Sequence, residues 1–254
     1  MIMGMAVYDT VDNNRTWMTA ATLASLNKTV DWDKHRLFIT DNGSCQATKD
    51  VLAMSNAYVI TNDRNQGTAR AVNKAWKFRK PGEHALKMDN DVTFAQAGWA
   101  DWMEDIFKRD PTIGIVGLKR NDLDENPDAT GTYTSKLHMI PHYKGQRWIV
   151  VEDAKMVMGT CQAYSDALLN KIGYLVQPGL YGFDDSLSSV RSTLAGFRNV
   201  FLHGFEIDHI DKGGTMFTKW KHSEAGKRLK DFGSMVLLYQ CGAIPLYHED
   251  ADDE

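Results

Sequence analysis

The feature that most constrains the fold of this chain is a regular alternation of short apolar runs with amphipathic segments in its first half. The apolar runs have the length of strands, and the segments between them carry apolar residues at helical spacing. A chain that alternates in this way typically forms a mostly parallel sheet with helices on both faces. We therefore expect an α/β fold, with strands near residues 2–8, 36–40, 57–61, 84–88 and 113–118, and helices near 16–26, 46–54, 68–78 and 97–108.

The second half is less regular. Residues 121–134 are polar and contain proline and glycine, which predicts a long loop. Further strands are expected near 136–140, 148–151, within 155–164, and at 199–202 and 206–210, with helices near 166–172, 184–195 and 218–232. A length of 254 residues suits one large domain. We expect a single domain over 1–248, divided into halves 1–120 and 121–248, followed by a disordered acidic tail over 249–254.

Composition places the chain among ordinary globular proteins, with 43% apolar and 24% charged residues. No apolar stretch is long enough for a membrane helix, and the N-terminus lacks the features of a signal peptide. The net charge of −4 comes from the acidic tail, and it excludes a strongly basic nucleic-acid-binding protein. Three widely separated cysteines form no metal-binding spacing, so we expect reduced thiols and a cytoplasmic location.

Two carboxylates one residue apart, Asp89 and Asp91, end the short apolar run at 84–88. Ligands of open α/β sheets bind just outside the carboxyl ends of the strands. A carboxylate pair there can hold a hard divalent cation, which in turn can hold a diphosphate. The alternative is a turn that caps a helix, because the chain from Thr93 onward reads as the start of one.

Polar residues also follow the other predicted strands. Tyr8 and Asp9 end the first strand, and Asp41 ends the second, where a carboxylate can accept hydrogen bonds from a base or ribose. Residues 65–73 join a turn to a helix, with small side chains and Arg70 near the helix start. An arginine there can complement a diphosphate. A solvated turn at Asp41 and a surface arginine at 70 are the alternatives at this stage.

Together these residues resemble a known family. The order Asp41-Asn42-Gly43-Ser44, then Asn65-x-Gly67-x-Ala69-Arg70-x-x-Asn73, then Asp89-Asn90-Asp91, and finally Gly182-Phe183-Asp184-Asp185 with Arg191, is similar to that of the family-2 glycosyltransferases. That family has the GT-A fold, with a Rossmann-like, mostly parallel central sheet and a smaller mixed sheet on the acceptor side. The spelling of residues 67–73 is closest to the branch with galactofuranosyl- and rhamnosyltransferases. The resemblance covers about residues 2–211.

The resemblance implies a nucleotide-sugar donor, such as a UDP-, dTDP- or GDP-sugar, bound by the first half of the chain. Asp41 would contact the base or ribose, and Asp89 and Asp91 would face the ribose and a Mn²⁺ or Mg²⁺ ion, with Asp91 the direct ligand. The resemblance also places Tyr8, Asp9, Arg70 and Asn73 among the donor-binding residues. A divalent cation stabilises the negative charge that the diphosphate gains as the sugar bond breaks.

Transfer to a hydroxyl also needs a base that takes the acceptor's proton. Asp185 matches the catalytic carboxylate of the family, and Asp184 is its neighbour. Adjacent acids in the first turn of a helix are otherwise explained by the helix dipole. Two departures from the family pattern, Asp184 in place of glutamate and Leu187 in place of an acid, leave open which of the two carboxylates acts.

A histidine downstream of the base often completes the metal site in this family. His209 lies at the expected separation, with Asp208 and Asp211 as candidate partners, and His203 is its competitor. Residues 219–230 form a basic segment, which is a solvated helix face, a flap over donor phosphates, or a surface for a phosphate-bearing acceptor such as DNA.

We therefore hypothesise a metal-dependent, inverting glycosyltransferase that moves a hexose or pentose to a hydroxyl of a saccharide, a protein or a hydroxylated DNA base. A nucleotidyltransferase of similar fold is one alternative, although residues 9–14 lack the glycine-rich basic loop expected of it. A catalytically inactive nucleotide-binding module is the other.

Overall fold

A computed structural model describes residues 1–122, 133–142, 147–213 and 215–249. Most of the loop predicted over 121–134 and all but the first residue of the predicted acidic tail lie outside these ranges. Among the helices of the described residues, none is long and apolar enough to cross a membrane.

Within the described residues, ten strands form one sheet, in the order β3-β2-β1-β4-β9-β6-β10-β8-β7, with β5 paired to β10. The strands are β1 (Ile2–Val7), β2 (Arg36–Asp41), β3 (Tyr58–Thr61), β4 (Ala85–Met88), β5 (Val92–Phe94), β6 (Ile113–Arg120), β7 (Tyr133–His142), β8 (Arg147–Ala154), β9 (Cys161–Tyr164) and β10 (Arg198–His209). Strands β1 to β4 pair in parallel, as do β6 and β10, and β9 runs antiparallel between these two groups.

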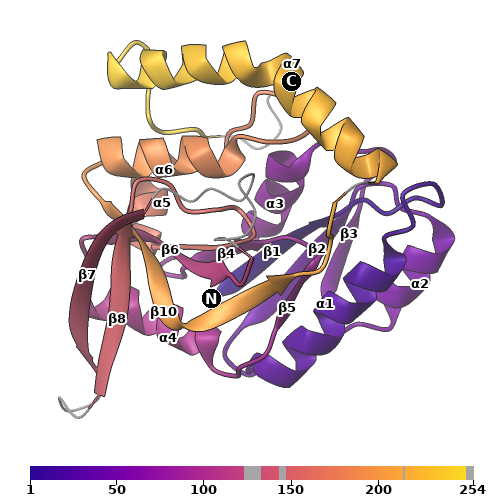
Figure 1. Cartoon of the computed structure of the whole chain (residues 1–254), viewed down its shortest axis with the longest axis horizontal. Coiled ribbons are helices and arrows are strands. Elements are labelled where there is room, and N and C mark those ends of the chain that lie inside the picture. Colours follow the sequence, from indigo (N-terminus) through magenta and orange to yellow (C-terminus); the bar gives the residue numbers. More distant parts are fainter. Residues whose placement is uncertain (123–132, 143–146, 214, 250–254) are drawn as a thin grey trace.

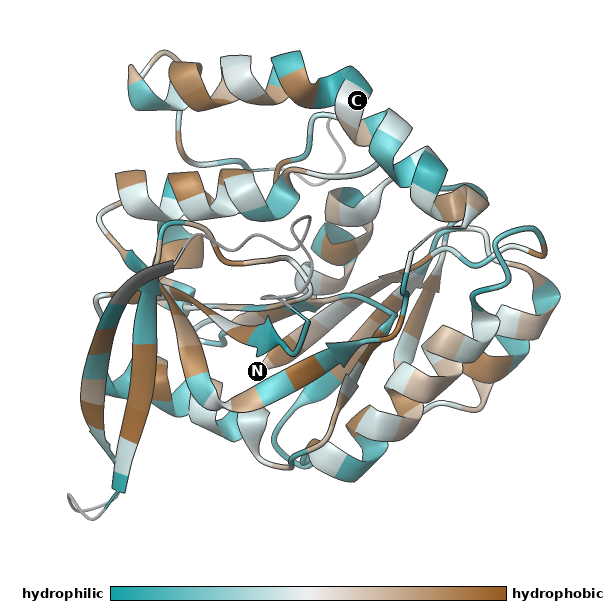
Figure 2. Ribbon diagram, in the orientation of Figure 1, coloured by the Kyte–Doolittle hydropathy of each residue, from teal (hydrophilic) through white to brown (hydrophobic). Residues whose placement is uncertain are grey.

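Helices cover both faces of the sheet, as the alternation of segments predicts (Figure 1). They are α1 (Thr16–Thr29), α2 (Gln46–Ala53), α3 (Thr68–Trp76), α4 (Trp99–Arg109), α5 (Asp166–Ile172), α6 (Asp184–Leu194) and α7 (Met216–Gln240). One apolar core lies between the sheet and α1, α2 and α4, and the other lies between the sheet and α3 and α5. Met3 and Ile2 belong to different cores because successive side chains of a strand point to opposite faces. Figure 2 shows apolar residues along most strands of the sheet.

The register of the parallel strands brings their carboxyl ends to one edge. Val7 pairs with Asp41, and Met5 pairs with Met88, so the residues that follow β1, β2 and β4 leave the sheet side by side. Helix α7 lies above α6, and its first turn reaches this edge (Figure 1). This convergence positions the site described below.

The chain departs from the sequence-based expectation after Asp91. The predicted start of a helix at Thr93 is wrong, because Val92–Phe94 forms β5, which pairs antiparallel with β10. A β-branched and aromatic triplet suits a strand, and the helix starts only after Gly98, whose φ of +86° favours glycine. The two strands predicted at 199–202 and 206–210 are one strand, β10, which has a register shift between Leu202 and Glu206.

Arg191 on α6 is fully buried, and its guanidinium serves the backbone. It donates hydrogen bonds to the carbonyl oxygens of Leu246 at 2.7 Å and 3.1 Å, of Tyr174 at 2.8 Å, and of Ile172. The sequence motif that includes Arg191 therefore contains a structural residue, which ties the segment after α7 to the end of α5.

We expect Arg191→Met to lower the free energy of unfolding by about 3 kcal/mol or more, because each buried carbonyl left without a donor costs about 1–3 kcal/mol. Urea denaturation followed by circular dichroism measures this change. Arg79→Met, which removes the partly exposed ion pair with Asp166, is the control and should cost less than about 1 kcal/mol. Equal losses in the two variants would contradict a structural role for Arg191.

Candidate active site

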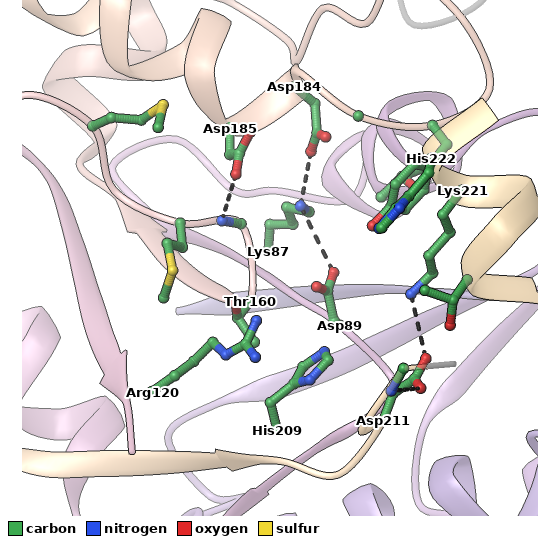
Figure 3. Close-up of a pocket in the computed structure, with 18 of the residues that line it drawn as sticks. Lys87, Asp89, Arg120, Thr160, Asp184, Asp185, His209, Asp211, Lys221 and His222 are labelled. Carbon is green, nitrogen blue, oxygen red and sulfur yellow. Dashed lines mark hydrogen bonds and ion pairs between the residues drawn. The ribbon is translucent and has the colours of Figure 1, made fainter. Parts of the chain in front are cut away.

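A cavity of about 530 Å³ opens at the carboxyl edge of the sheet. Its walls come from the ends of β4, β6 and β10, the segment before β9, the start of α6 and the start of α7. Acidic and basic side chains line it together. The acidic ones are Asp89, Asp184, Asp185 and Asp211, and the basic ones are Lys87, Arg120, Lys212 and Lys221, with His209 and His222 beside them. Figure 3 shows Lys87 between Asp184 and Asp89.

Asp89, Asn90 and Asp91 connect β4 to β5, and each has a different environment. The Asp89 side chain is 36% exposed and faces the cavity, where its Oδ1 lies 3.7 Å from Lys87 Nζ. Asn90 is buried, and its Nδ2 donates to Asp9 Oδ1 at 3.0 Å and to Thr19 Oγ1 at 2.8 Å. Asp91 is 2% exposed. The middle residue therefore anchors the connection, while Asp89 remains accessible.

Three basic side chains surround the Asp91 carboxylate. Arg15 Nη2 contacts Oδ2 at 2.5 Å, His209 Nε2 lies 3.4 Å from the same oxygen, and Lys221 Nζ lies 3.8 Å from it. Burial alone would raise the pKa of Asp91, but His209, Lys221 and Arg15 outweigh it and hold the pKa well below the usual aspartate value. Arg15 and Lys221 also pair with Asp211, so the two carboxylates share both cations.

His209 and Asp91 are placed side by side and have donor atoms that suit a divalent cation. Their nearest atoms, His209 Nε2 and Asp91 Oδ2, are 3.4 Å apart, and Arg15 contacts the same Asp91 oxygen in this structure. Asp91 Oδ1 and His209 Nδ1 are buried and lack hydrogen-bond partners within the described part of the chain. No group of three or more acidic, histidine or cysteine residues is placed to hold a metal within the described ranges. Diphosphate and water would supply the other ligands, as they commonly do for Mg²⁺.

The other predicted metal-site residues have different partners. His203 Nε2 lies 3.0 Å from Glu152 Oε2, so the structure brings His209 rather than His203 to Asp91. Asp208 accepts a hydrogen bond from Asn121 Nδ2 at 2.5 Å, and Asp211 pairs with Arg15 and Lys221. Asp208 is thus used elsewhere, whereas Asp211 shares its two cations with Asp91.

The residues predicted to bind the nucleotide separate into two groups. Tyr8 and Asp89 line a smaller cavity of about 70 Å³, together with Asn42 and with Phe217 and Trp220 of α7. Asp9 and Asp41 are buried beside it. Asp9 accepts from Asn90 and Thr19, whereas Asp41 accepts from the Ser44 N–H at 2.8 Å through Oδ1, and its Oδ2 has no partner among the described residues.

Arg70 and Asn73 do not reach these cavities. Both line a separate cavity between α3, residues 175–180 and α7. The Asn73 amide is fully used, because its Nδ2 donates to the Leu175 carbonyl oxygen and its Oδ1 accepts from the Leu175 N–H, both at 2.9 Å. The structure therefore gives Asn73 a role in holding the segment at 175, apart from Asp89 and Asp91.

Asp184 and Asp185 begin α6 directly after a sharp turn. Gly182 has a φ of +87° and Phe183 a φ of +69°, and Phe183 stacks on Phe232 of α7. Asp184 is buried, and its Oδ2 lies 2.8 Å from Lys87 Nζ. Asp185 Oδ2 accepts from the Gly159 N–H at 3.0 Å, and its Oδ1 accepts from the Ser186 N–H at 2.7 Å. Burial and the adjacent charge of Asp184 raise the pKa of Asp185, although Lys87 opposes the rise.

Sequence reasoning missed Arg15 and Lys87. Arg15 follows the polar loop after β1, and Lys87 interrupts an apolar strand two residues before Asp89. A lone lysine in a strand buried on both faces is unusual, and this was the available signal. Lys221 lies in the basic segment that the sequence did single out.

Comparisons with known proteins give the family and the fold of the chain. The pattern of the family described as glycosyl transferase family 2 matches residues 14–173. The chain is similar to the mannosyltransferase PcManGT from Pyrobaculum calidifontis in complex with GDP-Man and Mn²⁺, with 16% identity and a TM-score of 0.63 over 84% of this chain and 58% of that one. A comparison with curated protein sequences gives no match.

Two further structures share the fold. S. aureus TarS 1-349 has 18% identity and a TM-score of 0.59, over 83% of this chain and 60% of that one. GalNAc-T7 with UDP, GalNAc and Mn²⁺ has 13% identity and a TM-score of 0.59, over 82% of this chain and 43% of that one. The chain thus spans between 43% and 60% of the length of these three proteins.

We expect Asp185→Asn to raise the melting temperature at pH 7 by a few degrees. Folding raises the pKa of Asp185, so the unfolded chain gives up this proton at a lower pH than the folded protein. The folded protein therefore loses stability as the pH rises from the ordinary pKa of aspartate through the raised pKa of Asp185. Asparagine does not ionise, so Asp185→Asn avoids that loss. Thermal unfolding at several pH values measures the difference in melting temperature between Asp185→Asn and the wild type. This difference should become smaller as the pH falls toward about 4.

Asp231→Asn is the control, because Asp231 lies on the exposed side of α7 and is 54% exposed. Its melting temperature should follow the wild type at every pH. A lower melting temperature for Asp185→Asn at pH 7 would show that this carboxylate stabilises the fold and carries no ionisation cost.

Proposed function

The chain belongs to glycosyl transferase family 2, and from this premise we propose that it is a metal-dependent, inverting glycosyltransferase that uses a nucleotide-sugar donor. The observation that carries the proposal is the cavity in which His209 faces Asp184 and Asp185, while Asp91, 3.4 Å from His209, lines the smaller cavity that shares Asp89 and Lys221 with it. One pair suits a cation and its diphosphate, and the other suits removal of a proton. PcManGT with GDP-Man and Mn²⁺ and GalNAc-T7 with UDP and Mn²⁺ have the same fold, which supports a donor of this class.

Asp185 is the proposed base. It takes the proton of the acceptor hydroxyl as the hydroxyl oxygen forms a bond to the anomeric carbon of the donor sugar. The bond from that carbon to the diphosphate breaks in the same displacement, which inverts the anomeric configuration. The raised pKa of Asp185 suits this role, because a carboxylate that binds a proton more readily is a stronger base.

Asp91 and His209 are the proposed metal-holding residues, with Asp89 facing the donor beside them. A bound Mn²⁺ or Mg²⁺ would stabilise negative charge on the departing diphosphate. Arg15 and Lys221 already pair with Asp91 and Asp211, and both line the smaller cavity beside Asp89. Lys221 is only 15% exposed, so solvent screens its charge less than that of a surface lysine.

The finer assignments remain proposals. We propose that residues 1–120 form the donor-binding half and residues 121–248 the acceptor-binding half, with His209, Phe217 and Trp220 of the second half also lining the two cavities. Among donors, a UDP-, dTDP- or GDP-linked hexose or pentose fits, and the spelling of residues 67–73 favours the galactofuranosyl and rhamnosyl branch. The acceptor is a hydroxyl of a saccharide, a protein or a hydroxylated DNA base.

Binding of a nucleoside diphosphate with Mn²⁺ should raise the melting temperature, because a ligand that binds only the folded state stabilises it, by about 2.7 kcal/mol at 100 times its dissociation constant. UDP, GDP and dTDP, each with and without Mn²⁺, are the probes for a thermal-shift experiment. His209→Ala and Asp91→Asn should lose the part of the shift that depends on Mn²⁺.

His203→Ala is the matched control, since His203 is a histidine of the same strand that contacts Glu152. It should keep the full shift. A Mn²⁺-dependent shift that persists in both His209→Ala and Asp91→Asn would remove these residues from the proposed metal site.

Asp185→Asn should lower kcat for sugar transfer by about 100-fold to 10,000-fold while it leaves the Mn²⁺-dependent thermal shift unchanged, because it removes only the proton acceptor. Release of the nucleoside diphosphate measures turnover, and NMR of the product measures the anomeric configuration. Full activity in Asp185→Asn would place the base elsewhere. Binding without turnover of any nucleotide sugar would instead indicate an inactive nucleotide-binding module.

A further inference from the structure

Lys87 is a lysine in the middle of the sheet. Its strand, β4, lies between β1 and β9, and Lys87 pairs in register with Gly4 on one side and Gln162 on the other. The side chain is 4% exposed. Burial of an ammonium group costs several kcal/mol unless partners compensate its charge. Its position is therefore maintained by the groups that it contacts.

The Lys87 ammonium contacts both sides of the proposed site. Its Nζ lies 2.8 Å from Asp184 Oδ2 on the acceptor side and 3.7 Å from Asp89 Oδ1 on the donor side (Figure 3). Burial would lower the pKa of Lys87, but Asp184, Asp89 and Asp185 outweigh it and raise the pKa well above the usual lysine value. The ammonium therefore keeps its proton at neutral pH.

Gly159 makes this arrangement possible. A Cβ atom at position 159 would lie 2.3 Å from Lys87 Nζ, so with any other residue the ammonium would have to move from its present position. The Gly159 N–H also donates to Asp185 Oδ2 at 3.0 Å. One glycine thus admits the cation that pairs with Asp184 and supplies a neutral donor to Asp185.

The two adjacent carboxylates consequently differ. Asp184 forms an ion pair with a buried ammonium, whereas the contacts of Asp185 are the neutral N–H groups of Gly159 and Ser186 and the Ser186 hydroxyl. A carboxylate in an ion pair accepts a proton poorly, because protonation would break the pair and leave the ammonium uncompensated. A carboxylate that is held by neutral donors beside a fixed negative charge accepts a proton more readily.

We propose that Lys87 is a positioning residue that holds Asp184 as a fixed counter-charge, so that Asp185 is the carboxylate that receives the proton. This inference rests on the proposed transferase function, but the contacts of Lys87 with Asp184 and Asp89 are present without any substrate. Lys87 acts through the two aspartates and is not itself a catalytic residue. The proposal also names Asp185, rather than Asp184, as the base.

Several other charged or titratable groups face this cluster. They are Tyr164 on β9, Tyr181 before α6, Asp89 and Asp91 after β4, Arg120 on β6, His209 on β10, and Lys221 and His222 on α7. None of them is within an ion-pair distance of Asp184 or Asp185 in the described residues. Lys87 is therefore the cation whose removal should change the protonation of the pair most.

Carboxyl ¹³C NMR of protein labelled at aspartate tests the inference without any donor or acceptor. Asp184→Asn and Asp185→Asn assign the two signals. In the wild type, the first proton that the pair takes up as the pH falls should go to Asp185. In Lys87→Met the pair should take up that proton at a pH higher by about one unit or more and share it between both residues, because the opposite charge is gone.

Three further variants sharpen the test. Lys87→Arg should restore the wild-type order, since it keeps a cation. Gly159→Ala should move the titration in the direction of Lys87→Met and by a smaller amount, because the added methyl group displaces the ammonium without removing its charge. Lys119→Met, which removes the ion pair with Glu152 on β8, should leave the titration of Asp184 and Asp185 unchanged.

The acid limb of the pH profile of kcat should move in the same direction as the NMR titration, and Lys87→Arg should reverse that movement. The proposal is overturned if Asp185 in Lys87→Met and in Gly159→Ala takes up its proton as in the wild type, or if Asp184 takes it first in the wild type. If the NMR result holds and no nucleotide sugar is turned over, only the transferase proposal fails.

Discussion

The site depends on the compensation of charge among carboxylates at one edge of the sheet, of which Asp91, Asp184 and Asp211 are buried. Asp91 and Asp211 share Arg15 and Lys221, and Asp184 and Asp89 share Lys87. A buried carboxylate without such partners costs several kcal/mol. These pairs join residues from opposite ends of the chain, so the same contacts that make the acids tolerable also hold α6 and α7 against the donor side of the sheet.

Much of the fold and part of the site were predictable because the signals are local. Apolar periodicity gave the alternating strands and helices, and strand ends gave Asp41, Asp89 and Asp91. The parallel register then brings those ends together, so residues 50 positions apart become neighbours without any further information. His209 was preferred to His203 because of its separation from Asp185 in the family resemblance, and the structure shows that it ends β10, the strand that reaches the same edge.

The remainder was not predictable because it depends on contacts between distant parts of the chain. Arg15 is separated from Asp211 by 196 residues, and no local pattern marks that pairing. Arg70 has a helix-start position that suits a phosphate, yet α3 is oriented so that Arg70 and Asn73 face the segment at 175–180. Val92–Phe94 became a strand because β10 offers an edge to pair with, which a reading of the segment alone does not reveal.

The contrast between Asp91 and Asp185 explains why one fold can hold both a cation and a proton acceptor. Both are carboxylates at the same edge of the sheet, and burial raises the pKa of each. Three basic groups reverse that effect at Asp91 and keep it ionised, as a metal ligand must be. At Asp185 the nearest ammonium is directed to Asp184 instead, so the rise persists. Environments that push two like groups apart in pKa separate their chemical roles, and Lys87 is the side chain that creates this separation on the acceptor side.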